Sequence, residues 1–265
     1  MDLRKSKYIL PNLFTLASVF FGFVAVVSCL GTPTDAAFRR AAIAILVAGV
    51  ADSLDGRVAR MTRTATKFGI QLDSLADVLS FGMAPAVLGY VWAMGGLPAH
   101  AGELIAFAYV SCGALRLARF NVQADHGPSD TFTGLPIPAA ASAVALWVWA
   151  GTDLDLPHEV RVATMPVVML ATAILMVSTV PYPSFKHVKL PLAGRLVLIA
   201  VVAVVIVAAV RTRASAVLLG LALVFITLGP VGWAVRLPSR LRRLRSRRQA
   251  AGTEPRSEPA PEDEL

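Results

Sequence analysis

The sequence contains few of the residues that build disulfide-rich, zinc-binding or ordinary soluble proteins. Only two of its 265 residues are cysteine, four are histidine, and charged residues make up 16% of the chain. Cys29 and Cys112 stand in separate apolar stretches without a Cys-x-x-Cys or Cys/His spacing, which excludes a disulfide scaffold and a thiolate zinc site. Hydrophobic residues account for 56% of the chain, a share that excludes disordered, collagen-like and ordinary soluble proteins.

The hydrophobic residues are concentrated in runs of about 20, the length that an α-helix needs to cross ~30 Å of hydrocarbon. Loops with glycine and proline separate these runs. The apolar segments are residues 8–30, 36–60, 67–94, 102–120, 132–150, 161–180, 194–210 and 214–235. The pattern predicts an all-α, polytopic transmembrane bundle of about eight helices, formed by residues 1–235.

Basic residues are distributed unevenly between the two ends of the predicted helices. The chain has 25 lysines and arginines against 17 aspartates and glutamates, a formal net charge of +8. With an even number of spans both termini lie on one side, and most of the basic residues lie on that side too. Because cytoplasmic loops are enriched in lysine and arginine, we expect both termini in the cytoplasm.

The composition changes after residue 235. Seven arginines occur between residues 236 and 248, and a proline- and glutamate-rich stretch runs from Thr253 to Leu265. Arginines beside a bilayer attract anionic lipid headgroups without a specific site. We therefore expect residues 236–265 to form a disordered cytoplasmic tail that contacts membrane lipids and no nucleic acid.

Four aspartates stand inside the second and third apolar segments: Asp52 and Asp55, then Asp73 and Asp77. An aspartate at the centre of a membrane helix costs roughly 2.5–3.5 kcal/mol, so four together indicate a functional site. On a helix the first pair lies about 60° apart and the second about 40° apart, so each pair shares one face. The short connection at residues 61–67 makes the two helices antiparallel neighbours, which predicts one acidic site near the cytoplasmic end.

Four carboxylates in one place need compensating positive charge. A divalent cation suits them, because Mg²⁺, Mn²⁺ and Ca²⁺ prefer oxygen ligands and no histidine or cysteine joins the cluster. Two ions about 3.5–4 Å apart would hold phosphate oxygens. The alternatives are a proton relay or an interior ion-paired with Arg57 and Arg60. A cation- or proton-coupled transporter would also place acids inside the membrane.

The spacing of these aspartates resembles the signature of the CDP-alcohol phosphatidyltransferase family. Its fixed positions correspond to Asp52, Asp55, Gly56, Ala59, Arg60, Gly69, Asp73 and Asp77. The resemblance implies an all-helical membrane enzyme with its active site at the cytoplasmic side. Such an enzyme moves a phosphatidyl group from CDP-diacylglycerol to an alcohol and releases CMP. The resemblance also implies two divalent cations, Mg²⁺ or Mn²⁺.

The same resemblance implies roles for individual residues. The four aspartates would be the metal ligands, and Asp77 would also act as the general base. The cytidine and pyrophosphate of the donor would contact Gly56, Arg60 and, as a weaker candidate, Thr66. Near the start of the first apolar segment, Asn12 and Thr15 either touch the cytidine or cap the first helix.

Four further polar segments bear on the choice of acceptor: residues 11–15, 115–121, 132–138 and 181–186. They resemble the corresponding segments of bacterial membrane-embedded phosphatidylserine synthases within this family. The resemblance implies L-serine as acceptor, a bacterial cytoplasmic (inner) membrane location and a homodimer. Glycerol 3-phosphate or inositol phosphate as acceptor are the alternatives within the same chemistry.

Two of these segments, residues 115–121 and 181–186, contain candidate acceptor-binding residues. Arg116 and Arg119 have the forked guanidinium that binds a carboxylate or phosphate through two hydrogen bonds, and Asn121 has an amide that orients a substrate. The arginines could equally be cytoplasmic anchors, and Asn121 a helix cap. Lys186 either binds substrate or faces lipid phosphates.

Overall fold

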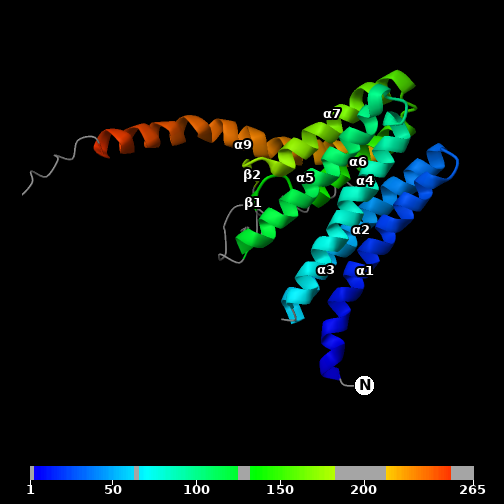
Figure 1. Ribbon diagram of the computed structural model, residues 1–265, viewed down its shortest axis with the longest axis horizontal. Helices are drawn as coiled ribbons and strands as arrows, with labels where there is room; N and C mark the ends of the chain where they lie inside the picture. The colour runs from blue at the N-terminus through cyan, green and yellow to red at the C-terminus, as the bar shows by residue number, and fades with distance from the viewer. Residues whose placement is uncertain (1–2, 63–65, 125–131, 183–212, 252–265) are drawn as a thin grey trace, which may run out of the picture.

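The computed structural model describes residues 3–62, 66–124, 132–182 and 213–251, and these are almost entirely helical (Figure 1). The elements are α1 (Leu3–Leu30), α2 (Asp35–Thr62), α3 (Lys67–Asp77), η1 (Val78–Met83), α4 (Ala84–Gly89), η2 (Tyr90–Met94), η3 (Pro98–His100), α5 (Ala101–Ala124), β1 (Phe132–Thr133), α6 (Ile137–Asp153), α7 (His158–Val177), β2 (Pro181–Tyr182) and α9 (Ala214–Ala251). The prediction of an all-α chain is confirmed.

Five helical stretches in the described residues are long and apolar enough to cross a membrane. They are Asn12–Leu30, Phe68–Met94, Pro98–Gln123, His158–Val177 and Ala214–Trp233. Two other predicted segments also form helices but are not among these five: α2 carries charged residues, and α6 has only 17 residues. The segment 194–210 lies outside the described residues, so the count of eight helices stays a prediction.

Helix α6 forms the centre of the bundle. It packs against α2, α4, α7 and α9, and most of its residues are buried, from Ile137 to Thr152. Near its start lies the run Ala139-Ala140-Ala141. Small side chains let neighbouring helices approach closely, which explains how four elements surround one short helix.

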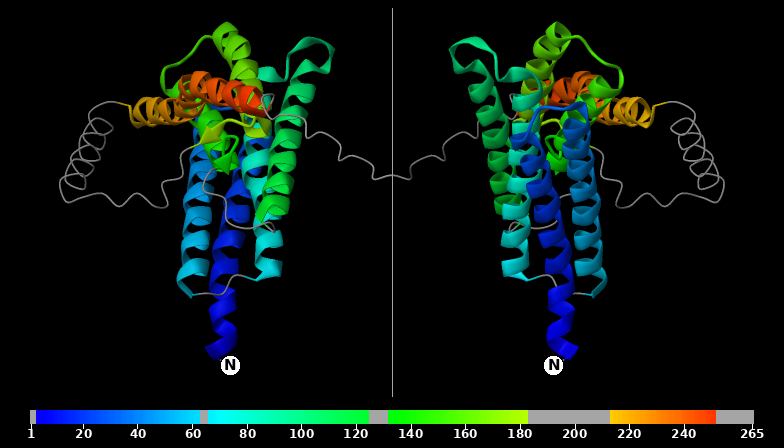
Figure 2. Two further views of the ribbon diagram at one scale, coloured as in Figure 1. Left: turned by 90° about the vertical axis from the view of Figure 1, so that its left-hand side faces the viewer. Right: turned by 90° about the vertical axis from the view of Figure 1, so that its right-hand side faces the viewer.

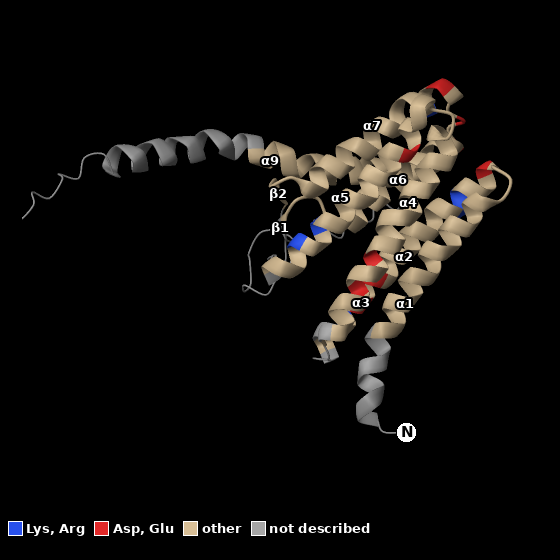
Figure 3. Cartoon of the chain, viewed as in Figure 1, with Lys and Arg blue, Asp and Glu red and all other residues tan. Residues whose placement is uncertain are grey.

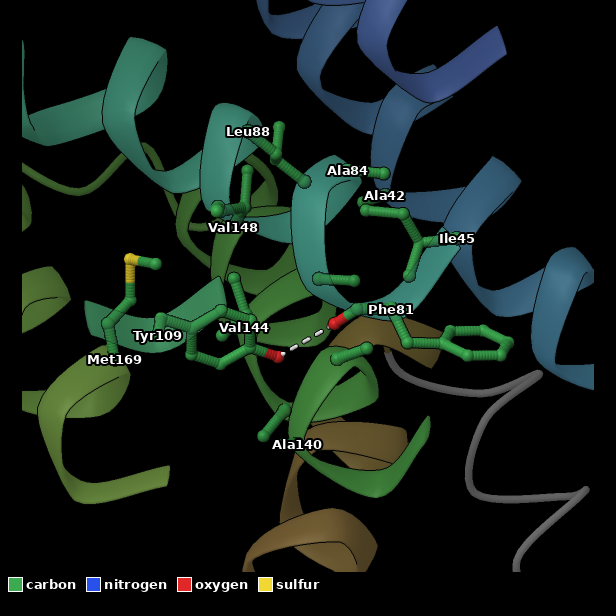
Figure 4. Packing of buried hydrophobic residues seen from close by; sticks show 14 of the residues in the cluster. Ala42, Ile45, Phe81, Ala84, Leu88, Tyr109, Ala140, Val144, Val148 and Met169 are labelled. Atoms are coloured by element: carbon green, nitrogen blue, oxygen red, sulfur yellow. Dashed lines mark hydrogen bonds between the residues drawn. The ribbon is translucent and has the colours of Figure 1, made fainter. Parts of the chain in front are cut away.

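The third apolar segment forms one continuous helical stretch, α3–η1–α4–η2, with two π-helical parts. Pro85 explains the first of these, because it has no N–H to donate to the carbonyl four residues earlier, and its ring crowds that carbonyl. This carbonyl belongs to Phe81 and instead accepts a hydrogen bond of 3.2 Å from the hydroxyl of Tyr109 on α5, as Figure 4 shows. Tyr109 is fully buried, so its hydroxyl satisfies a polar group that no water reaches.

The start of α6 differs from the sequence prediction, which placed a helix from residue 132. Phe132–Thr133 is a strand paired antiparallel with Pro181–Tyr182, and α6 begins only at Ile137. Gly134 has a positive φ of 82°, which favours glycine. Its N–H donates to Val180 O at 2.9 Å. The chain therefore makes a tight turn before α6, and this turn lies against the end of α7.

Helix α9 runs across the bundle rather than parallel to α1 and α2 (Figure 2). The hydroxyl of Tyr182 in β2 donates to Ile226 O of α9 at 3.1 Å, and burial raises the pKa of this tyrosine to about 12. The helix continues to Ala251. The structure thus continues α9 through residues 236–251, where the sequence predicted a disordered tail, and residues 252–265 lie outside the described part of the chain.

A group of charged and hydroxyl side chains joins four helices at one end of the bundle. Arg39 of α2 pairs with Asp153 of α6 at 3.0 Å, and Ser215 of α9 donates to the other oxygen of Asp153 at 2.6 Å. Arg161 of α7 lies 4.0 Å from Asp35 at the start of α2. We refer to these five residues as the distal cluster, because they lie at the opposite end of α2 from Asp52 and Asp55 (Figure 3).

Candidate active site

Helices α2 and α3 bring three of the predicted aspartates together. Asp52, Asp73 and Asp77 each offer a carboxylate oxygen within 4.8 Å of the others. In Figure 3 the acidic positions of α3 lie beside the bundle, well away from the distal cluster. No lysine or arginine of the described residues forms an ion pair with these carboxylates. The side chain of Arg57 is exposed, which counts against the alternative that Arg57 neutralises these carboxylates inside the protein.

The fourth aspartate, Asp55, is held by the first helix. It is 7% exposed, and its carboxylate accepts a hydrogen bond from the hydroxyl of Thr15, itself buried in α1. Thr15 was predicted to touch the cytidine or to cap α1, whereas here its hydroxyl is directed to a carboxylate of the acidic site. Asp55 is thus oriented by α1, apart from the three clustered aspartates.

Asp77 occupies the last position of α3, directly before the π-helical part η1. Segments of π-helix occur frequently at functional sites. In η1, the hydroxyl of Ser80 donates to the carbonyl of Ser18 on α1 at 3.0 Å. A Cβ atom on Gly22 would lie only 2.8 Å from the Cα of Ser80, so α1 and η1 are in close backbone contact. This contact fixes the helix that carries Asp77.

Two buried polar atoms near the acidic site have no hydrogen-bond partner among the described residues. They are Oδ1 of Asp77 and Nε of Arg116. Arg116 is 8% exposed and interacts electrostatically with Asp77. Buried polar atoms are nearly always paired. These two belong to side chains of opposite charge on α3 and α5, and their missing partners point to a ligand that would pair with both.

Arg119, one turn after Arg116 on α5, donates hydrogen bonds only to backbone carbonyls in the described structure. Its two terminal nitrogens reach the oxygens of Val177 at 2.8 Å, Thr133 at 3.1 Å, Ser178 at 3.2 Å and Met176 at 3.3 Å. The guanidinium therefore joins the end of α7 to strand β1.

The remaining predicted acceptor residues are only partly described. The amide of Asn121 donates to the hydroxyl of Ser74 at 2.9 Å, which joins the end of α5 to α3 between Asp73 and Asp77. Lys186 lies outside the described residues. Asn121 is therefore a contact between two helices of the site, next to the carboxylates.

The predicted donor-binding residues gather at the ends of α1, α2 and α3. Thr66 caps α3, accepting a hydrogen bond from the N–H of Gly69 at 3.0 Å. A Cβ on Gly69 would lie 3.7 Å from the amide oxygen of Asn12, so α1 and α3 meet here. Gly56 is partly buried on α2; Arg60 also lies on α2, but its side chain is outside the described part of the chain.

The residues of the acidic site fit a divalent cation. All donors are carboxylate oxygens, which suit hard cations, and Oδ1 of Asp77 is buried without a hydrogen-bond partner among the described residues. Asp52, Asp73 and Asp77 can hold one ion together. Asp55 stands close enough to Asp52 and Asp73 to interact with both electrostatically.

Several residues that support the site were not predicted from the sequence. Ser80 and Tyr109 hold the helix around Asp77, because their hydroxyls donate to the backbone carbonyls of Ser18 and Phe81. One signal for them was present: Pro85, four residues after Phe81, leaves a carbonyl that needs another donor. The donor itself comes from a different helix, which no local pattern identifies.

Comparison with known proteins assigns the chain to a family. A model of the CDP-alcohol phosphatidyltransferases matches residues 8–237. The chain belongs to this family. It is therefore an integral membrane protein, and the four aspartates on α2 and α3 lie within the matched residues.

Curated relatives of this phosphatidyltransferase carry closely related names. The chain is 35% identical to a CDP-diacylglycerol--serine O-phosphatidyltransferase of Helicobacter pylori over 69% of its length and 75% of the relative's. It is 36% identical to an archaetidylserine synthase of Methanothermobacter thermautotrophicus, over 66% of this chain and 69% of the relative. A CDP-diacylglycerol--serine O-phosphatidyltransferase of Mycobacterium bovis is 32% identical, over 76% of this chain and 70% of the relative.

Proposed function

We propose that this protein transfers the phosphatidyl group of CDP-diacylglycerol to the hydroxyl of L-serine, giving phosphatidylserine and CMP. The observation that carries the proposal is the partly buried carboxylate cluster of Asp52, Asp73 and Asp77, with Arg116, whose Nε has no hydrogen-bond partner among the described residues, on the neighbouring helix. The family assignment supports the donor. Relatives named for serine transfer support the acceptor.

We propose that the carboxylates hold two divalent cations, Mg²⁺ or Mn²⁺. Asp52, Asp73 and Asp77 would bind one ion jointly, and Asp55, oriented by Thr15, would contribute to the second. When bound, such ions neutralise the pyrophosphate oxygens of the donor and make its phosphorus more electrophilic. Gly56 and Arg60 on α2, Thr66 before α3, and Asn12 on α1 would contact the cytidine and pyrophosphate.

The reaction is a direct displacement. Asp77 takes the proton of the serine hydroxyl, a new oxygen–phosphorus bond forms at the lipid-bearing phosphorus, and the bond to the CMP oxygen breaks. General-base catalysis of this kind contributes about 10²–10⁴-fold to the rate. The fork of Arg116 binds the carboxylate of the acceptor. A nucleophilic Ser/His/Asp or Cys/His set is not needed for this route.

The enzyme is placed in the bacterial cytoplasmic membrane, with both termini and the acidic site facing the cytoplasm. This orientation rests on the excess of lysine and arginine at that end of the helices. CDP-diacylglycerol reaches the site from the membrane, and serine reaches it from water. Lys186 is a further candidate for binding substrate, and a homodimer is the expected assembly.

The test is CMP release by the purified protein in detergent with CDP-diacylglycerol and Mn²⁺ or Mg²⁺. L-serine, glycerol 3-phosphate and inositol phosphate are compared as acceptors. Release that depends on serine and stops with a chelator is expected. Release with another acceptor alone would refute the assignment of serine, and no release with any metal would favour a binding or transport role.

Replacing Asp77 by asparagine tests the general base. With Mn²⁺ at a saturating concentration, so that the remaining aspartates still hold the ions, we expect Asp77→Asn to lower kcat by roughly 10²–10⁴-fold while donor binding changes little. The matched control is Asp155→Asn, because Asp155 is exposed at the other end of the bundle. Wild-type turnover in Asp77→Asn would remove this residue from the proposed role.

A further inference from the structure

The guanidinium of Arg119 stabilises the end of α7 and the turn before α6 at the same time. The last carbonyls of a helix lack partners within the helix, and a cation at this end interacts favourably with them. Arg119 supplies such a cation from α5, and its bonds to Met176, Val177 and Ser178 lie between 2.8 and 3.3 Å. Its fourth acceptor is the carbonyl of Thr133 in β1.

The turn itself depends on this arrangement. A Cβ on Gly134 would lie 2.9 Å from the terminal nitrogen Nη2 of Arg119 and 3.0 Å from the carbonyl of Ser178. Only glycine fits this space with the positive φ observed there. The next residue, Leu135, donates its N–H to Leu175 O at 2.9 Å. Arg119 and the N–H groups of the turn thus hold residues 133–135 against the end of α7 and the residues that directly follow it.

The turn and the acidic site interact with the same face of α5. Arg116 and Arg119 are three residues apart, so they share one face of α5, and Arg116 interacts with Asp77. Gly113, one turn earlier on the same face, contacts Ile137 at the start of α6: a Cβ there would lie 2.7 Å from the Cδ1 atom of Ile137. One face of α5 therefore contacts the start of α6 at Gly113, places Arg116 next to Asp77, and holds the turn through Arg119.

We propose that Arg119 is a positioning residue for the acceptor. It holds the turn of residues 133–135, and this turn forms a wall of the pocket in which Arg116 meets the substrate carboxylate. This proposal rests on the proposed serine transfer. The two arginines then have separate roles. Arg116 is buried with an unpartnered Nε and is available to a ligand, whereas both terminal nitrogens of Arg119 are engaged by the protein backbone.

The test combines kinetics with peptide-resolved hydrogen exchange on the full-length protein in detergent. Arg119→Gln is compared with Arg116→Gln and with Arg40→Gln, a control for losing an arginine that is exposed on α2. Arg119→Lys keeps the charge and three donors but not the fork, and it provides a second variant if the glutamine variant does not fold.

For Arg119→Gln we expect faster exchange in peptides that cover residues 132–136 and 176–182, and a KM for serine roughly tenfold higher. The KM for CDP-diacylglycerol and exchange in α2 and α3 should stay at wild-type values. The serine KM and the exchange rates of Arg119→Lys should lie between those of the wild-type protein and those of Arg119→Gln. Arg116→Gln should raise the KM for serine without changing exchange in the turn, and Arg40→Gln should change neither.

Each other outcome overturns the proposal. A higher serine KM in Arg119→Gln with unchanged exchange would make Arg119 a direct ligand of serine. Faster exchange with an unchanged serine KM would place the turn outside the acceptor pocket, and loss of donor binding would indicate a general defect. If the wild-type protein shows no release that depends on serine, the proposed function fails, whatever the exchange data show.

Discussion

The hydrogen bond from Tyr109 to Phe81 gives a prediction whose magnitude follows from the structure. Pro85 prevents the usual backbone donor from reaching the Phe81 carbonyl, and the Tyr109 hydroxyl donates to it at 3.2 Å. Tyr109→Phe removes that hydroxyl and leaves the ring, which is packed against Val144 and Met169 in Figure 4. The variant thus isolates one hydrogen bond in a region that water does not reach.

The expected cost of Tyr109→Phe is about 1–3 kcal/mol, the penalty for leaving a buried carbonyl without its donor. For a protein of this size each kcal/mol lowers Tm by about 2–4 °C, so the expected decrease is about 2–12 °C. Because η1 directly follows Asp77, we also expect a higher metal concentration for half-maximal activity.

Thermal unfolding of the purified protein in detergent measures this decrease. Tyr90→Phe is the matched control, because the Tyr90 hydroxyl donates to Glu103 at an exposed position, where substitutions change stability by only about 0.5 kcal/mol or less. Equal Tm values for the two variants would refute the reasoning that the Phe81 carbonyl depends on Tyr109.

Two further variants test the contacts of α1. Thr15→Val should raise the Mn²⁺ concentration for half-maximal activity about tenfold, because Asp55 loses the donor that orients it; Thr15→Ser should restore the wild-type value, and a serine variant as impaired as the valine variant would contradict this role. Gly22→Ala should destabilise the protein by about 1–3 kcal/mol, because the new methyl group overlaps Ser80. Gly31→Ala, where nothing lies within 4 Å, is its control, and similar Tm values for both would contradict the close contact.

The helices and the acidic cluster could be predicted because local features of the sequence determine them. Apolar runs of about 20 residues define membrane helices, and the spacing of Asp52, Asp55, Asp73 and Asp77 puts each pair on one helix face. The short connection after α2 then leaves little freedom in how the pairs meet. Three of these carboxylates lie together in the structure.

The contacts around the cluster could not be predicted, because they join residues that are far apart in the sequence. Arg119 looked equally suited to a substrate or a membrane anchor, and its backbone acceptors lie up to 59 residues away. The strand at Phe132 was assigned to a helix because the residues are apolar, and its pairing partner is Tyr182. Periodicity reports the face of a helix but not which distant carbonyl needs a donor.

Because of the distal cluster, the interactions that hold the helices together differ between the two ends of the bundle. At that end, separating the helices breaks the pairs of Arg39 with Asp153 and of Arg161 with Asp35, and the hydrogen bond from Ser215. At the other end, carboxylates of like charge repel one another until a cation binds. Without a cation, the helices therefore separate more easily at the acidic end, and a cation bound by Asp52, Asp73 and Asp77 would also hold that end of the bundle together.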